Sequence, residues 1–355
     1  QETLAVSLIR QCAASSVACH WAWAALARSE ILEGKLTEAS AHLQQAIRGF
    51  PTCWDYWSDL GWCYHSEGKL AAALKAYTRA DELLAARRCA EDLKDPRDGK
   101  GARKRETVAH VRVKTQVGTI QRSIGQVDEA VESFGVALEI SSFIPDPSGV
   151  ISVVSGLALA GAGEAYLAQA HARTSEGLYT AAATALHKGC DTTRRFLDGI
   201  RGGSEQEGEK LFALKLLGDL YTYGHKLPPM VFKAEETWGT NTNTDCGVDG
   251  RQGGGGSLRN LGAKEAASAR LAAAKKSSRN RIEFVARGAD AYQQLVQLLR
   301  DDEQKKEDSL SPALYDLGLN HLLRARLVCA EAGEGSGLWP QENYENIPEA
   351  AELAR

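Results

Sequence analysis

The chain has 355 residues and a formal net charge of −4, and 25% of its residues are charged. This balance excludes a strong overall attraction to nucleic acids or to membrane surfaces. No run of about eighteen apolar residues is present, so the sequence predicts no membrane-spanning helix. The length exceeds what one compact core usually holds, a limit that a repeating architecture escapes because each repeat contacts only its neighbours.

Two stretches near the N-terminus repeat the same pattern of residue types with a period of 34 residues. In each copy a tryptophan is followed at matching offsets by leucine, a small residue, glycine and two alanines. This period and this order of bulky, small and helix-ending residues are the signature of the tetratricopeptide (TPR) repeat. The pattern residues are Trp23, Leu26, Ala27, Gly34, Ala39 and Ala46 in the first copy and Trp57, Leu60, Gly61, Tyr64, Gly68, Ala73, Tyr77 and Ala80 in the second.

The spacing within the second copy predicts a pair of antiparallel helices. Trp57, Leu60 and Tyr64 fall on one stripe of a first helix, which we call helix A. Gly61 is small on that stripe, where the second helix, helix B, must approach closely. Gly68 follows helix A, at the point where a left-handed turn favours a residue without Cβ. One such hairpin cannot bury both its faces, so neighbouring hairpins must stack.

Further units follow with less regular patterns. The third unit follows an insertion after helix B of the second copy, and its pattern residues have the same spacing as those of the second copy. These residues are Gly118, Gly125, Ala130, Phe134 and Ala137. Three more helix A stripes each contain a central glycine, and helix B of the first of them is expected within residues 177–198. These glycines are Gly163, Gly218 and Gly318.

Together these units predict an all-α TPR solenoid, in which stacked antiparallel helix hairpins wind into a right-handed superhelix. We expect a leading helix with units 1 and 2, a charged loop insertion, irregular units 3 to 5, a flexible linker, and further TPR-like helices that are truncated at the end. These segments span residues 1–86, 87–106, 107–235, 236–260 and 261–355. The chain begins at Gln1 without methionine and ends on what reads as the start of a helix, so we expect a fragment of a longer protein.

Three segments depart from the repeat pattern. Residues 87–106 mix eight basic with five acidic residues and read as a solvated surface loop, with a contact for RNA or an acidic partner as the alternative. Residues 236–260 are rich in Gly, Asn and Thr, which predicts a flexible linker. Residues 264–281 hold six basic residues in an Ala-rich run that predicts a solvated helix continuing to Leu299, with RNA phosphates as the alternative contact.

Signatures of catalysis are missing from the sequence. It contains no nucleophile-elbow, zinc-protease or phosphate-loop motif, and no serine, histidine and aspartate share an informative spacing. The eight cysteines form no CxxC pair, and we interpret them as reduced thiols packed between helices rather than as zinc ligands. We therefore expect no catalytic residue, cofactor or metal site and no enzymatic activity, and we predict neither a membrane contact nor a firm nucleic-acid contact.

Tryptophans cluster in the first two units. Trp23 and Trp57 occupy the core position of the repeat, whereas Trp21, Trp54 and Trp62 lie off that stripe. Exposed aromatic side chains often mark interfaces. Stacking on RNA bases is the alternative, but few basic residues are interleaved with these tryptophans. Helix packing or a protein contact is favoured, and Trp54 and Trp62 are the candidate contacts for a partner.

Several blocks of the sequence resemble a known family in their order and irregular spacing. The blocks are residues 53–83, 113–134, 163–186, 214–222 and 315–333. Their order is similar to the central to C-terminal part of the TPR scaffold subunit of the superkiller (Ski) complex. The resemblance covers most of the chain but leaves out the two insertions described above.

The resemblance implies a scaffold without catalysis. The family's subunit is a TPR superhelix that holds a DExH-box RNA helicase and WD-repeat propeller subunits, in a cytoplasmic assembly that feeds RNA 3′ ends to the exosome. A cytoplasmic location follows, with a nuclear pool as an alternative.

Two other functions remain open, a generic TPR adaptor for peptide segments and the TPR portion of a larger enzyme. A chaperone-type carboxylate clamp is disfavoured, because it needs Lys and Asn at positions that hold Ala24 and Arg28, then Ser58 and Trp62.

Overall fold

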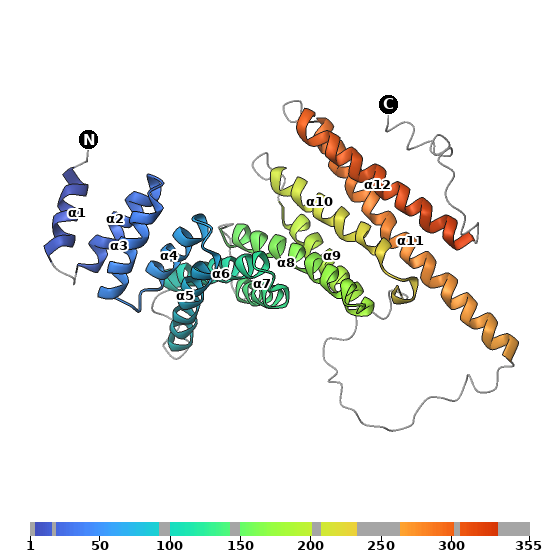
Figure 1. Ribbon diagram of the computed structural model, residues 1–355, viewed down its shortest axis with the longest axis horizontal. Coiled ribbons are helices and arrows are strands. Elements are labelled where there is room, and N and C mark those ends of the chain that lie inside the picture. Colours follow the sequence, from blue (N-terminus) through green and yellow to red (C-terminus); the bar gives the residue numbers. More distant parts are fainter. Residues whose placement is uncertain are drawn as a thin grey trace, which may run out of the picture. The chain divides into compact units, whose positions relative to one another are not determined.

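The computed structural model describes residues 4–15, 19–91, 100–142, 150–200, 207–232, 263–301 and 306–332. Within these ranges every regular element is a helix (Figure 1). The elements are α1 (Leu4–Ser15), α2 (His20–Leu32), α3 (Leu36–Gly49), α4 (Trp54–Ser66), α5 (Leu70–Glu91), α6 (Lys100–Ser123), α7 (Val127–Ser142), α8 (Val150–Ser175), α9 (Tyr179–Gly199), α10 (Glu207–Tyr223), the 3-10 turns η2 (Gly224–Lys226) and η3 (Pro229–Val231), α11 (Ala263–Asp301) and α12 (Lys306–Ala332).

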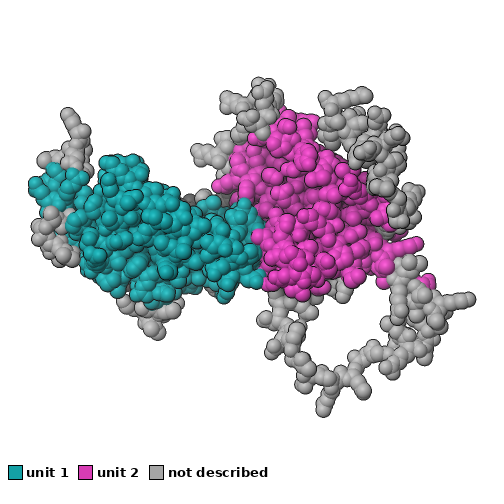
Figure 2. Space-filling view, viewed as in Figure 1, with its two compact units in different colours: residues 1–165 teal, residues 166–355 magenta. Residues whose placement is uncertain are grey.

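The chain divides into two compact units, residues 1–165 and 166–355, which Figure 2 colours separately. Unit 1 is built from helix pairs, α2 with α3, α4 with α5 and α6 with α7. Each pair packs on the next, through α3 against α4 and α5 against α6. These pairs are the three hairpins that the repeat pattern predicts, so the expected all-α class and the stacking of neighbouring hairpins are confirmed.

A glycine in the left-handed region of the backbone ends helix A in each of the first four repeats. Their φ angles lie between +75° and +86°, where a side chain would be strained. The residue after each glycine donates its N–H to a carbonyl five residues back, as Lys69 does to Tyr64 at 2.8 Å. This bond satisfies a carbonyl at the helix end. The glycines are Gly34, Gly68, Gly125 and Gly177.

An aromatic ring of helix B lies over a glycine of helix A in the second and third hairpins. A Cβ placed on Gly61 would stand 2.9 Å from the ring of Tyr77, and one on Gly118 would stand 3.0 Å from the ring of Phe134. Gly161 of α8 approaches the other edge of the Phe134 ring, with a Cβ position 2.4 Å away. Phe134 is therefore enclosed between α6 and α8 and is fully buried.

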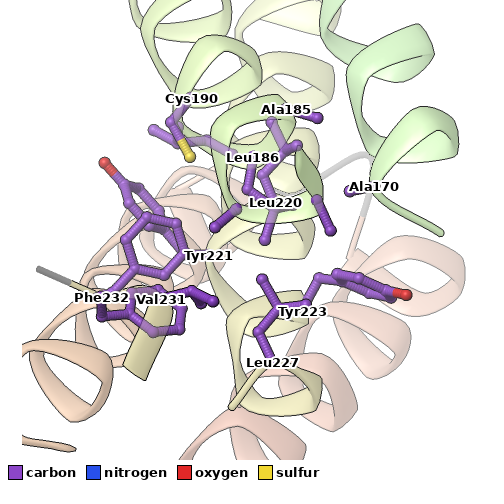
Figure 3. Packing of buried hydrophobic residues seen from close by; sticks show 14 of the residues in the cluster. Ala170, Ala185, Leu186, Cys190, Leu220, Tyr221, Tyr223, Leu227, Val231 and Phe232 are labelled. Atoms are coloured by element: carbon purple, nitrogen blue, oxygen red, sulfur yellow. The ribbon is translucent and has the colours of Figure 1, made fainter. Parts of the chain in front are cut away.

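Unit 2 has its own core, where α9, α10 and the two 3-10 turns meet α11. Figure 3 shows Leu186 of α9 close to Leu220 of α10, and both are fully buried. Phe232, which follows η3, lies with its ring centroid 5.3 Å from that of Phe284 in α11. Tyr221 meets the same Phe284 ring edge-on at 4.8 Å. The aromatic contacts thus join the turns after α10 to α11.

α10 and α11 form one hairpin, although residues 233–262 lie between them in the chain. A Cβ on Gly218 would stand 2.5 Å from the ring of Tyr292, which repeats the contact of Gly61 with Tyr77. The Tyr292 hydroxyl also donates to Asp219 at 2.6 Å. The sequence pattern predicted no helix B for the fifth unit. In the structure α11, which follows residues 233–262, takes this place.

α12 packs on α11 and is tied to both helices of that hairpin by one buried amide. The Nδ2 of Asn320 donates to Thr222 Oγ1 at 2.7 Å and to the carbonyl of Val285 at 3.1 Å. Gly318 differs from Gly61, Gly118 and Gly218, which stand at the corresponding position of helix A, because no atom lies within 4 Å of its Cβ position. Among the residues that the structure describes, Gly318 is thus not at a close helix crossing.

The charged segment 87–106 is largely helical, which corrects the expectation of a loop. α5 continues through Glu91 and α6 begins at Lys100, so only residues 92–99 lie outside the described ranges. Arg87 and Glu106 form an ion pair at 2.6 Å between the two helices. Arg, Lys, Glu and Ala are strong helix formers, and here this propensity outweighs the turn tendency of Gly101.

Some expectations fall outside the described residues. These are the flexible linker at 236–260, the helix start near the C-terminus, and the far end of the last TPR-like segment. The basic run 264–281 does belong to a single helix, α11, which extends to Asp301. Over the described ranges, none of the helices has the length and apolar character needed to cross a membrane.

Two histidines of unit 2 have lowered pKa values, and we therefore expect the stability of this unit to be sensitive to mild acid. Burial lowers the pKa of His171 and of His225, and the Lys226 ammonium lowers both further. As the pH falls, the two imidazoles bind protons at a higher pH in the unfolded chain than in the folded chain. The contribution of the neutral imidazoles to the free energy of unfolding is therefore fully present above about pH 6.5, and it is lost as the pH falls through the folded-state pKa values. We expect unit 2 to melt at lower temperature at roughly pH 5.5 than at 7.5.

Melting curves over this pH range check the expectation in the native chain and in a variant with His171→Gln and His225→Gln. The double variant should show a flatter dependence on pH. An unchanged slope would mean that other groups are responsible.

Candidate partner-binding surface

The pattern residues of the first two repeats lie mostly in the core. Leu26, Ala27, Leu60, Tyr77 and the four pattern alanines are buried, and the small ones among them stand where helices touch. Trp23 and Trp57 are half-buried: the Trp23 ring stacks on His42 with centroids 5.2 Å apart, and Trp57 Nε1 donates to the Pro51 carbonyl at 2.8 Å. Ala130, Phe134 and Ala137 of the third repeat are fully buried, and Gly163 is buried.

One face of the first two A helices presents two exposed tryptophans. Trp21 on α2 is 53% exposed and Trp62 on α4 is 42% exposed. Trp21 and Arg28 lie two turns apart on α2, and Asp55, Asp59 and Trp62 follow the i, i+4, i+7 spacing of one face of α4. We call these five residues the helix A surface.

Ion pairs join the two helices at the centre of this surface. Arg28 Nε donates to Asp59 Oδ2 at 2.8 Å, and Arg28 Nη2 pairs with Asp55. Burial lowers the pKa of Arg28, but the carboxylates of Asp59 and Asp55 more than offset this effect and raise the pKa overall. Arg28 is thus held by two carboxylates of the next repeat, in the forked geometry that guanidinium groups favour.

Asp59 is the more enclosed of the two carboxylates. Burial raises its pKa above the ordinary value, although the Arg28 guanidinium and Arg112 of α6 oppose that shift. Helix α6, which contains Arg112 and is helix A of the third repeat, therefore lies near the same surface. The charges here are largely satisfied within the chain, while the indole rings remain open to solvent.

The two tryptophans chosen from the sequence differ in environment. Trp54 is half-buried and packs with Leu70 and Leu74 against the core shared by α5 and α6. Trp62 is exposed on the helix A surface. Trp21, which also lies off the core stripe but was not predicted as a contact, is more exposed than either. The sequence signal for the exposure of Trp21 and Trp62 is their position in the repeat, because both residues lie off the core stripe of helix A.

Two observations bear on metal binding and on thiol reactivity in the described part of the chain. There, no group of three His, Cys, Asp or Glu side chains is placed to hold a metal ion. Burial raises the pKa of Cys63 to about 11, so this thiol is a packing residue and not an activated nucleophile.

The fold and this surface define a class of protein: a TPR solenoid, built of stacked antiparallel helix hairpins that serve as a protein-interaction module. The tetratricopeptide repeat family matches residues 55–83, which are the α4–α5 hairpin.

Two curated relatives share a longer stretch of sequence. Human superkiller complex protein 3 is 37% identical over 70 residues, which are 20% of this chain and 4% of that protein. The mouse protein of the same name matches with the same identity and coverage. The matched stretch is thus a small part of the length of these relatives.

Solved structures with low sequence identity align over most of the chain. The crystal structure of BtubC from P. vanneervenii is 12% identical and covers 87% of this chain and 94% of its own, with a TM-score of 0.34. The TPR domain of P58(IPK) is 15% identical and covers 95% of this chain and 98% of its own, with a TM-score of 0.31. At these TM-scores the alignments do not establish a shared arrangement of repeats.

Proposed function

We propose that this chain is a non-catalytic scaffold of the superkiller type, which holds an RNA helicase and WD-repeat subunits for cytoplasmic 3′–5′ decay of mRNA by the exosome. The scaffold role rests on stacked TPR hairpins that leave exposed indole rings on the helix A surface. The choice of assembly is supported by the match to superkiller complex protein 3 and by the order of the irregular sequence blocks.

A generic peptide adaptor is the second candidate, because TPR hairpins bind peptide segments in many proteins. The structure gives one reason against the carboxylate-clamp form of this function. Arg28, which occupies the position where the clamp of the first repeat needs Asn, is already paired with Asp55 and Asp59. It is therefore committed within the chain and is not available to bind a terminal carboxylate.

Affinity purification of the tagged chain from its native cell tests the proposal. We expect mass spectrometry to identify a DExH-box helicase and WD-repeat proteins among the retained partners. Recovery of chaperones without either class would contradict the superkiller assignment. Nucleotide hydrolysis by the isolated chain would contradict the non-catalytic role.

Trp62→Ala should weaken binding to such a partner while leaving the fold intact. Tryptophan is over-represented among residues whose truncation costs about 2 kcal/mol or more at interfaces, which is roughly thirtyfold in Kd. Because the side chain is 42% exposed, we expect the free energy of unfolding to change by less than about 1 kcal/mol.

Phe212→Ala in α10 is the matched control for this prediction, since Phe212 is 40% exposed and lies in unit 2. Titration of both variants with the purified partner gives the comparison. An equal loss of affinity in the two variants would show that the effect does not belong to the helix A surface.

A further inference from the structure

A groove of about 400 Å³ lies in unit 1 between the B helices α3 and α5 and the A helix α4. Three apolar residues of its lining, Ile47 of α3 and Trp57 and Leu60 of α4, are called its floor, and the charged Arg48 of α3 and Lys75 of α5 are called its rim. The volume lies in the range of small-molecule pockets, which begins at about 300 Å³. The groove exists because Ala72 and Ala76, one turn apart on α5, are too small to fill the space between the two B helices.

The floor of the groove is apolar and tightly packed. Leu60 is 4% exposed and Ile47 is 9% exposed, and the half-buried Trp57 ring lies beside them. Gln44 Nε2 donates to the Tyr64 hydroxyl at 2.8 Å across the groove wall. That bond leaves the Tyr64 proton free to be donated to an occupant.

The rim of the groove is basic and lacks its own counter-charge. Arg48 on α3 and Lys75 on α5 are exposed, and neither forms an ion pair with a carboxylate among the residues that the structure describes. Arg48 donates to the Gln45 side chain at 3.4 Å. Neighbouring cations differ, since Lys69 pairs with Glu67 at 2.9 Å and Arg79 pairs with Glu82 at 2.7 Å.

We propose that this groove docks an acidic amphipathic helix of a partner protein, with one bulky apolar side chain on the floor and carboxylates against Arg48 and Lys75. The apolar floor supplies the gain from burial, and the two unpaired cations select an acidic partner. The lining of the groove shares no residue with the helix A surface, and the proposal does not depend on the assembly proposed above.

Fluorescence anisotropy with a designed probe tests the proposal. The probe is a fluorescein-labelled, Ala-based peptide of about 15 residues, long enough to be partly helical, with one Phe and with Asp and Glu on the same face at i−3 and i+4. Probes with Phe→Ser, and with both acids changed to Lys, are compared with it. We expect each change to weaken binding to the full chain at least about tenfold.

Variants of the chain locate the binding. Arg48→Glu with Lys75→Glu removes the basic rim, and Ala72→Trp fills the groove from a half-buried position. Lys188→Glu with Lys210→Glu makes the same change in charge at two exposed residues of unit 2. We expect at least about tenfold weaker probe binding in the first two variants and no change in the third, with circular dichroism unchanged in all.

Several results would overturn the proposal. Equal losses in the rim variant and in the unit 2 variant would show non-specific attraction, and unchanged binding in the Ala72→Trp variant would place the probe elsewhere. No measurable binding of the acidic probe, or self-association of the chain that Ala72→Trp abolishes, would also reject a partner helix as the occupant. None of these results affects recovery of helicase and propeller partners, which tests the proposed function separately.

Discussion

Replacing Phe134 with alanine is expected to lower the free energy of unfolding of unit 1 by about 3–5 kcal/mol, as for other fully buried phenylalanines. The ring is 0% exposed and fills the space between Gly118 and Gly161. Neither glycine has a side chain that could move into the vacated volume, so the cavity cannot collapse easily. Because a domain is stable by only about 5–15 kcal/mol, this is a large share of the total.

The loss should be confined to the repeats that contact the ring. In a solenoid each repeat is stabilised by its neighbours, so hydrogen exchange should speed up in α6, α7 and the first half of α8. Chemical denaturation followed by circular dichroism gives the free energy. Phe212→Ala, at an exposed phenylalanine in unit 2, should cost less than about 1 kcal/mol, and a similar loss in both variants would contradict the enclosure of Phe134.

The elements that could be predicted from sequence are those whose cause is local. Gly68 stands where the chain must adopt a positive φ, and only its position after a helical stripe is needed to see this. The pairing of α4 with α5 follows in the same way, because the two stripes lie next to each other in the chain. The short period of the repeat thus fixes the hairpins of unit 1.

Features that depend on distant contacts could not be predicted. Tyr292 lies over Gly218 in the same way as Tyr77 lies over Gly61, but it comes after residues 233–262, and no fixed offset points to it. The helix of residues 100–106 was missed because Gly101 reads as a turn signal when its neighbours in space are unknown.

The surfaces were predicted only in part for the same reason. The pairing of Arg28 with Asp55 and Asp59 joins two repeats, and nothing in the repeat pattern requires it. The different burial of Trp54 and Trp62 depends on whether α6 covers them, which the spacing within one helix does not reveal. The groove between α3 and α5 likewise depends on the distance between two B helices.

Gly61→Trp should destabilise unit 1 by about 3 kcal/mol or more, at the upper end of what overpacking costs. A Cβ alone would stand 2.9 Å from the Tyr77 ring, and Tyr77 is 2% exposed and cannot swing into solvent. An indole at this position therefore has to separate α4 from α5. That separation also opens the core that α5 shares with α6, since Tyr77 belongs to it.

Gly135→Trp is the matched control, because Gly135 is an exposed glycine within α7 with no atom inside 4 Å of its Cβ position. There the same side chain should change the free energy of unfolding by less than about 1 kcal/mol, and helix propensity even favours it slightly over glycine. Thermal melting of the two variants separates the explanations: if both lose the same stability, a general intolerance of bulk and not the close crossing at Gly61 is the cause. A loss at Gly61 alone, with faster hydrogen exchange in α4 and α5, means that the approach of these two helices depends on the missing side chain.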